Sequence, residues 1–192
     1  MIRCRDHSTG VLGTPVFVAA EFDGSDSTLA ALTVAHPGSS IDGIADPPIT
    51  RDGIRIVPFV WLFRGIPLAK VRRALGDFER QGREVEVLSE TPAADRLLAR
   101  AHVTMETSMS RGVQVVARFL GALHNPWVHI DDGRFYVRAR VSRPAEAEVL
   151  ALRLDRTLKA ACLLAQVDVQ ALDRHDLSVW EELVEATIGL SR

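Results

Sequence analysis

One order of turn, strand and helix signals occurs twice in this chain, and it constrains the fold more than any other feature. Asp-Gly at 52–53 precedes an apolar run, Pro67 precedes a helical stretch, and Val-Glu-Val at 85–87 has the composition of a strand. The same signals follow about 80 residues later, at 132–133, Pro144 and 167–169. A repeated strand–helix–strand pattern predicts two related β-α-β units that pack around a shared core.

The repeat therefore predicts an α+β protein of two related β-α-β lobes, each with a small, mainly antiparallel sheet flanked by helices. A cleft between two such lobes is a common place for a ligand or a partner. We expect four segments along the chain: a flexible N-terminus at 1–13, a first lobe at 14–90, a second lobe at 91–175 and a C-terminal helix at 176–192.

Composition places the chain among ordinary globular proteins. Its 192 residues are 47% hydrophobic and 25% charged, and the net charge is −2. A chain of this length buries roughly 70% of its unfolded surface, which supports a core without disulfides or metals. The charge balance gives no field that would draw the protein onto nucleic acid or an anionic membrane. We therefore expect neither direct nucleic-acid binding nor membrane association.

The cysteines and the start of the chain predict a cytoplasmic protein. Cys4 and Cys162 are the only cysteines and do not form a disulfide framework. The first residues contain no apolar region of the kind found in signal peptides. No apolar run approaches the roughly 20 residues that span a bilayer.

Several local signals predict individual elements. Residues 37–50 are rich in Gly, Ser, Asp and Pro and predict a loop or a meandering edge. Thr91-Pro92 has the composition of a helix start, so a helix carrying Leu97 and Leu98 is expected after it. Apolar spacing predicts a further helix at 111–123. Ser178 and Glu181 form a capping box, which predicts a last helix from Ser178 to about Gly189.

Phe59, Trp61 and Phe63 alternate along one strand and therefore share one face of a sheet. They can form an aromatic wall for a flat ligand or a partner helix. They can equally form a core layer beneath the adjacent helices, in which case Trp61→Ala should destabilise the fold by about 3–5 kcal/mol. Together with Trp127, these rings mark the predicted cleft between the lobes.

The strand at 134–141 carries a polar face of Arg134, Tyr136, Arg138 and Arg140. This face can bind an anion or stack on a base, with Arg138 and Arg140 as the candidate residues, although a solvated sheet face has the same pattern. The apolar side of the last helix includes Trp180, which is the remaining candidate. That helix can pack on its own domain or pair with a second chain.

No catalytic or metal-binding signature accompanies these features. The metal-capable side chains at 4–7 and at His124, His129 and Asp131 lack zinc-ligand spacing, so no metal and no cofactor are expected. There is no nucleophile elbow, P-loop or dinucleotide fingerprint. An enzyme stays the alternative, with a site assembled between the lobes from scattered residues such as His36, His102, His124 and Glu106.

Short motifs along residues 15–170 follow the order of one known family. They are Glu21-Phe22, Pro58-Phe59-Val60-Trp61, Gly65, Val85-Glu86-Val87-Leu88, Arg96-Leu97, Asp132-Gly133 and Arg138-Ala139-Arg140. In this order the chain resembles the sensor or effector domain of archaeal bacterio-opsin-activator-type transcription regulators. In that family a DNA-binding helix-turn-helix follows the domain, whereas only 23 residues follow Val169 here.

The resemblance implies a regulatory or sensing module without its DNA-binding part. The expected function is therefore non-enzymatic: the protein senses a small ligand or docks a partner protein, in the context of transcription regulation. A homo-oligomer or a complex with a partner protein is the expected assembly.

Overall fold

The computed structural model describes residues 16–24, 27–46, 49–80, 82–104, 115, 126–141, 143–161, 163 and 165–189. Within them lie nine strands, four α-helices and one 3-10 helix. In chain order the elements are β1 (Val16–Asp23), α1 (Thr28–Ala35), β2 (Ser40–Ala45), β3 (Ile49–Arg51), β4 (Ile54–Arg64), α2 (Leu68–Arg80), β5 (Val85–Thr91), the 3-10 helix η1 (Pro92–Ala94), β6 (Arg96–Thr104), β7 (Trp127–Asp131), β8 (Arg134–Val141), α4 (Pro144–Ala160), β9 (Ala165–Ala171) and α5 (Arg174–Gly189).

The elements that the repeated pattern predicts are present in both copies. The first copy consists of β4, α2 and β5, and the second consists of β8, α4 and β9. The Asp-Gly pairs form the turns before β4 and β8, where Asp52 and Asp132 have φ angles of 53° and 44°. The following glycines, Gly53 and Gly133, have φ angles of 77° and 76°. Two successive positive φ angles match the twist of a two-residue hairpin, which explains the Asp-Gly sequence at both places.

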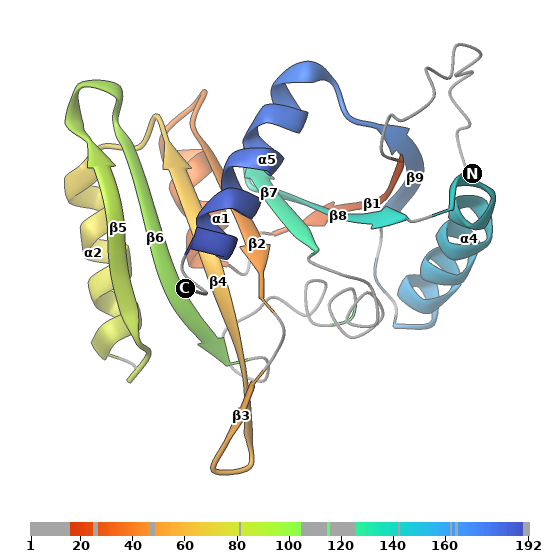
Figure 1. Ribbon diagram of the computed structural model, residues 1–192, viewed down its shortest axis with the longest axis horizontal. Coiled ribbons are helices and arrows are strands. Elements are labelled where there is room, and N and C mark those ends of the chain that lie inside the picture. Colours follow the sequence, from red (N-terminus) through yellow and green to blue (C-terminus); the bar gives the residue numbers. More distant parts are fainter. Residues whose placement is uncertain are drawn as a thin grey trace.

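All the strand pairs are antiparallel, and the strands form one sheet in the order β5-β6-β4-β2-β7-β8-β1-β9, with β3 paired to β4 (Figure 1). The α+β class is thus confirmed, but the arrangement in two lobes with separate sheets is not. The central strands β2 and β7 join the halves through the pairs from Ser40↔Asp131 to Ile44↔Trp127.

Each half of the sheet also contains a strand from the range predicted for the other lobe. In one half β6 lies between β4 and β5, and in the other β1 lies between β8 and β9. Strands of the ranges 14–90 and 91–175 are therefore mixed within the sheet. Since β4 and β5 are both antiparallel to β6, they are parallel to each other, and the same holds for β8 and β9 around β1.

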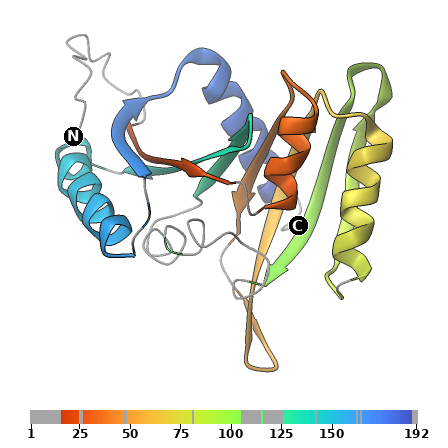
Figure 2. The ribbon, with the colours of Figure 1, turned by 180° about the vertical axis from the view of Figure 1, so that it is seen from behind.

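The two faces of the sheet are covered unequally. Helices α1, α2 and α4 lie on one face, seen from behind in Figure 2, and α5 lies on the other. The larger cluster of buried apolar side chains lies under the three helices and includes Phe59, Trp61 and Phe63. Their exposed fractions are 2%, 4% and 0%, so the three rings form a core layer beneath the helices.

Two local predictions were wrong. The stretch after Pro92 forms one short 3-10 turn and then β6, not a helix, because Leu97, Ala99 and Ala101 alternate into the core beside β4. The polar stretch at 37–50 contains β2, which is central in the sheet, where Ile41 and Ile44 are fully buried.

The last helix begins earlier than its capping box predicts. Helix α5 starts at Arg174, four residues before Ser178. The Asp173 carboxylate accepts the backbone N–H of Asp176 at 2.8 Å, so Asp173 takes the capping role. The Ser178 hydroxyl instead donates to the carbonyl of His175. The predicted flexible N-terminus and the predicted helix at 111–123 lie outside the described residues, apart from Val115.

Gly43 allows the Trp61 ring to lie against the backbone of β2. A Cβ atom on Gly43 would stand 2.4 Å from the Trp61 ring, whereas on Gly76 in α2 it would stand 3.6 Å from the Arg80 guanidinium. We expect Gly43→Ala to lower the free energy of unfolding by about 1–3 kcal/mol through overpacking. Gly76→Ala, the control, should raise it by about 0.5–1 kcal/mol, because alanine favours a helix. Urea unfolding of both variants checks this, and a neutral Gly43→Ala would contradict the packing.

Candidate functional site

The face that carries α5 contains a fully buried carboxylate. Asp42 lies on β2 with 0% of its surface exposed. Its Oδ2 accepts a hydrogen bond from Arg64 Nη2 at 2.7 Å, and its Oδ1 accepts from His129 Nδ1 at 2.7 Å and Trp127 Nε1 at 3.2 Å. We call these four residues the Asp42 network. They come from β2, β4 and β7, so the network crosses the seam of the sheet, the β2–β7 pairing that joins its two halves.

Pairing keeps Asp42 ionised despite its burial. Burial by itself would raise the pKa of Asp42, because a low-dielectric surrounding disfavours the charged form. The hydrogen bond and charge of His129, together with the charge of Arg64, outweigh burial and hold the pKa of Asp42 below its usual value of 3.8. The carboxylate therefore acts as a fixed negative charge in the middle of the sheet.

Two chains of contacts run from Asp42 to the first turn of α5. In one, Arg64 Nη1 lies 3.2 Å from His175 Nε2. Since a guanidinium can only donate, His175 Nε2 is the acceptor in this contact. In the other, the Arg138 guanidinium lies 4.5 Å above the Trp127 ring, and Arg138 Nη1 donates to Asp176 Oδ2 at 2.8 Å. Asp42 thus orients both side chains that hold the start of α5.

The rest of α5 packs on the sheet of its own chain. Val179 and Leu183 are 5% and 0% exposed in the smaller apolar cluster, which also contains Phe17 and Trp127. Trp180 is partly buried and meets Phe17 edge-to-face, with ring centroids 5.9 Å apart. Of the two arrangements expected for the last helix, this is packing within its own domain.

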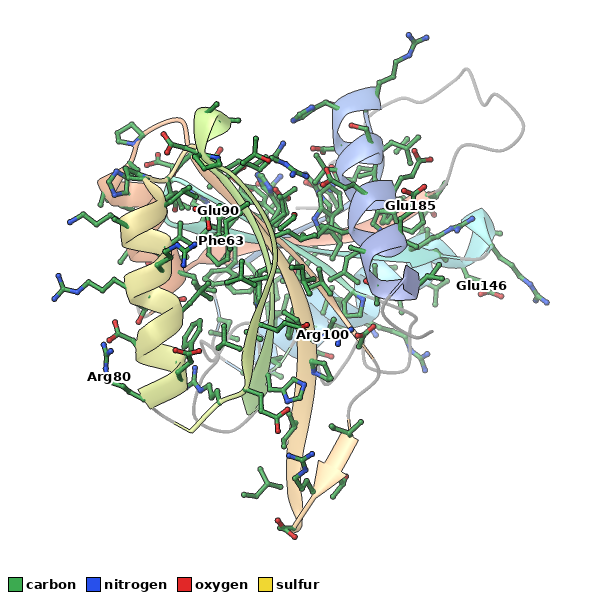
Figure 3. All side chains as sticks on the ribbon, turned by 60° about the vertical axis from the view of Figure 1, so that its left-hand side comes forward. Phe63, Arg80, Glu90, Arg100, Glu146 and Glu185 are labelled. Atoms are coloured by element: carbon green, nitrogen blue, oxygen red, sulfur yellow. The ribbon has the colours of Figure 1, made fainter. Side chains whose placement is uncertain are left out.

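Arginines line the α5 face, and most of them have carboxylate partners. The pairs are Arg64–Asp42, Arg96–Glu182, Arg100–Glu86, Arg134–Glu21 and Arg138–Asp176. Figure 3 shows the strands between α2 and α5, with Phe63 on the α2 side and Arg100 on the α5 side.

Arg140 differs from these arginines. It is exposed, lies 5.6 Å from the centre of the Trp180 ring, and has no carboxylate partner among the described residues. It is thus the one strand arginine on this face, within the described part of the chain, whose charge is not already paired.

The seven residues predicted from the sequence as candidates lie on two different faces of the sheet. Phe59, Trp61 and Phe63 lie under α1 and α2, and Trp127, Arg138, Arg140 and Trp180 lie on the α5 face. Trp127 is 0% exposed and Arg138 is 9% exposed, so both belong to the scaffold that holds α5. Arg140 and Trp180 are the two that reach the surface together.

Of the residues of the enzyme alternative, His36 and His102 are described, and they make no contact with each other. His102 Nδ1 lies 3.1 Å from an exposed carboxylate, that of Glu84, and His36 is half-buried on the loop after α1. His124 and Glu106 lie outside the described residues. The close histidine–carboxylate pair is His129–Asp42, which sequence reasoning missed because Asp42 lies in the stretch interpreted as a loop. Among the described residues no cluster of three metal-ligating side chains occurs.

A surface hollow of about 560 Å³ lies between α1 and the β7–β8 turn. Its walls include Ala31, Val34 and Arg134. Val34 is 56% exposed there, so this hollow is open and mostly apolar. It shares none of its wall with the Asp42 network.

No protein-family model and no curated protein matches this chain. Within the described residues, none of the helices has the length and apolar character needed to cross a bilayer.

Removal of the Asp42 charge should destabilise the protein by about 2–4 kcal/mol, because Asp42→Asn leaves Arg64 and His129 without their anion. Since the pKa of Asp42 is lowered on folding, its stabilisation is present above the unfolded pKa and is lost as the pH falls through the still lower folded value. The difference between wild type and Asp42→Asn should therefore be full at pH 7 and shrink below about pH 4.

Urea unfolding at pH 7, 5 and 3 measures this difference. Glu86→Gln is the control, because Glu86 lies 3.8 Å from Arg100 and its side chain is 61% exposed. It should change the stability by about 0–1 kcal/mol. If Asp42→Asn changed the stability at pH 7 by as little as Glu86→Gln does, the Asp42 network would not stabilise the fold as we expect.

Proposed function

We propose that the protein is a non-enzymatic regulatory module that binds an acidic ligand, or an acidic segment of a partner protein, at Arg140 and Trp180. The single observation that carries this proposal is the contrast between Arg140 and its neighbours. Five strand arginines on the α5 face have carboxylates within 4 Å, whereas Arg140 has none among the described residues. An exposed guanidinium beside an aromatic ring offers a donor fork for an anion and a flat apolar surface beside it.

The structure around Arg140 favours binding over a purely structural role. Arg138 on the same strand is 9% exposed and already has Trp127 and Asp176 as partners. The contacts of Arg138 thus hold α5, while Arg140 is exposed and Trp180 is partly exposed. A ligand there would contact both the sheet and α5, and its binding would bias the position of α5.

The regulatory context of the proposal comes from the resemblance to bacterio-opsin-activator-type regulators. We also propose that the two β-α-β copies are related units, although they share one sheet, and that the protein acts in the cytoplasm. The α5 face spans both units, because β4 and β8 each supply an arginine that contacts the first turn of α5.

Titration with acidic probes tests this function. We expect a short glutamate-rich peptide or pyrophosphate to change the fluorescence of Trp180 saturably, because Trp61 and Trp127 are 4% and 0% exposed. Arg140→Glu should weaken binding at least about tenfold, which corresponds to about 1.4 kcal/mol. Arg153→Glu, on the exposed side of α4, is the matched control and should bind as the wild type does. Failure of both probes to bind, or equal loss in the two variants, would contradict the proposal.

The geometry of His129 favours a second candidate function, an enzyme. A buried carboxylate that accepts from Nδ1 orients a histidine ring, and the neutral form of such a ring can take a proton at Nε2, as in general-base catalysis. The His129 side chain is 17% exposed, so solvent reaches it.

Hydrolysis of p-nitrophenyl acetate distinguishes this candidate from the binding module. An oriented general base should hydrolyse the ester faster than free imidazole at the same concentration. His129→Gln and Asp42→Asn should both abolish the excess, while Arg140→Glu should retain it. A rate equal to that of imidazole would contradict the enzyme candidate and leave the binding proposal untouched.

A further inference from the structure

The two edges of the sheet are built differently. At one edge, β5 pairs with β6 through a register shift between Val87 and Ser89. Such an irregularity twists an edge strand and hinders pairing with another chain. At the other edge, β9 pairs with β1 in unbroken register from Ala165 to Ala171. No described strand pairs with the outer side of β9.

We propose that two copies of this chain form a symmetric dimer through the open edge of β9 and the adjacent helix α4. The dimer would join two sheets edge to edge across a twofold axis. In such an interface the same surface of each chain meets itself, so every residue must suit the residue that the symmetry places opposite it.

The sequence of β9 suits antiparallel pairing with its own copy. The strand is Ala-Gln-Val-Asp-Val-Gln-Ala, which has the same order in both directions. A twofold axis at Asp168 would place two carboxylates opposite each other, which is unfavourable. An axis at Val167 or Val169 instead places Asp168 opposite a glutamine of the second copy, either Gln166 or Gln170. The glutamine amide can donate to the carboxylate.

One carboxylate oxygen of Asp168, Oδ1, has no hydrogen-bond donor in the described part of the chain. Its Oδ2 accepts from Gln166 Nε2 at 2.8 Å. Its Oδ1 is shielded from solvent and has no hydrogen-bond partner among the described residues. An unsatisfied acceptor in such a place is unfavourable by about 1–3 kcal/mol. Because this oxygen is already covered within the chain, the Asp168 carboxylate would have to turn toward the edge of β9 to accept from a glutamine of a second copy.

The helix next to this edge carries exposed apolar side chains. Helix α4 packs on β9 and β1, and Figure 1 shows it at the same end of the molecule as β9. On α4, Val149 is 57% exposed and Leu152 is 44% exposed. When two sheets join at an edge, the helices above that edge come together, so Leu152 would be covered by the second copy.

The charges on α4 fit an antiparallel copy of the same helix. Glu148, Leu152 and Lys159 follow at spacings of 4 and 7 residues and therefore share one side of α4. An antiparallel second helix would place Glu148 opposite Lys159 of its copy at both ends of the contact, where Lys159 already pairs with Asp155 of its own helix at 2.7 Å. Leu152 would lie between these ends. This charge order favours a second copy over an unrelated segment.

Analytical ultracentrifugation of the full chain, from about 1 to 200 µM, tests the dimer. We expect a mass of twice the 21.1 kDa of the chain at the upper end. Leu152→Glu should raise the dimer dissociation constant at least tenfold. Val87→Glu is the matched control, because Val87 on the opposite edge is 42% exposed, and it should change that constant less than twofold. Circular dichroism checks that both variants fold.

Hydrogen exchange of the wild type locates the contact. We expect the amides of β9 to exchange more slowly in the dimer than in a sample diluted below the dissociation constant, with β5 unchanged. A monomer at all concentrations would overturn the proposal, as would a dimer that Leu152→Glu leaves intact. A dimer that Val87→Glu disrupts would assign the contact to β5 and would also overturn it.

Discussion

A buried carboxylate, Asp42, organises the face of the sheet that α5 covers. A single unpaired charge in the middle of a sheet is strongly unfavourable, so its position demands donors on the neighbouring strands. Arg64, His129 and Trp127 supply them from β4 and β7. The same contacts fix the side chains on which the first turn of α5 is placed. The charge therefore links the seam of the sheet to the position of the last helix.

The helices on the two faces of the sheet are therefore held by different kinds of contact. Under α1, α2 and α4 the packing is apolar and aromatic, with Phe59 and Trp61 stacked at 4.7 Å between ring centroids. On the other face α5 adds a smaller apolar cluster, and its first turn is held by hydrogen bonds and ion pairs. Polar contacts depend on geometry and charge more steeply than apolar packing does, so the anion binding that we propose at Arg140 would act on the face whose contacts are more sensitive to charge.

Local signals allowed much of the fold to be predicted. The Asp-Gly turns, Pro67 and Pro144 define short-range geometry, and β4, α2, β8 and α4 follow them as expected. Leu97 and Leu98 gave no such guidance, because adjacent leucines suit a helix or a strand. Their strand arises from pairing with β4, whose residue Phe63 lies opposite Leu97. The order of the strands also depends on such long-range pairing. It brings both copies of the repeated pattern into one sheet, whereas the sequence predicted two.

The candidate site was harder to predict for the same reason. Asp42 lies in a polar, Gly-containing stretch, and its partners Arg64 and His129 are 22 and 87 residues away. Alternation placed Arg138 and Arg140 on one face correctly. It could not show that Arg138 would lie under α5 with Asp176 while Arg140 stayed exposed, because that depends on where α5 packs.

The measurement that tests the central claim most directly is native-state hydrogen exchange of α5 in wild type and in Asp42→Asn. If Asp42 holds α5 through Arg64 and Trp127, the opening free energy of α5 should fall by more than that of α2, which packs on the other face. Selective loss of protection in α5 is the predicted result. An equal fall in α5 and α2 would contradict the account, because Asp42 would then stabilise the sheet as a whole and not the position of α5.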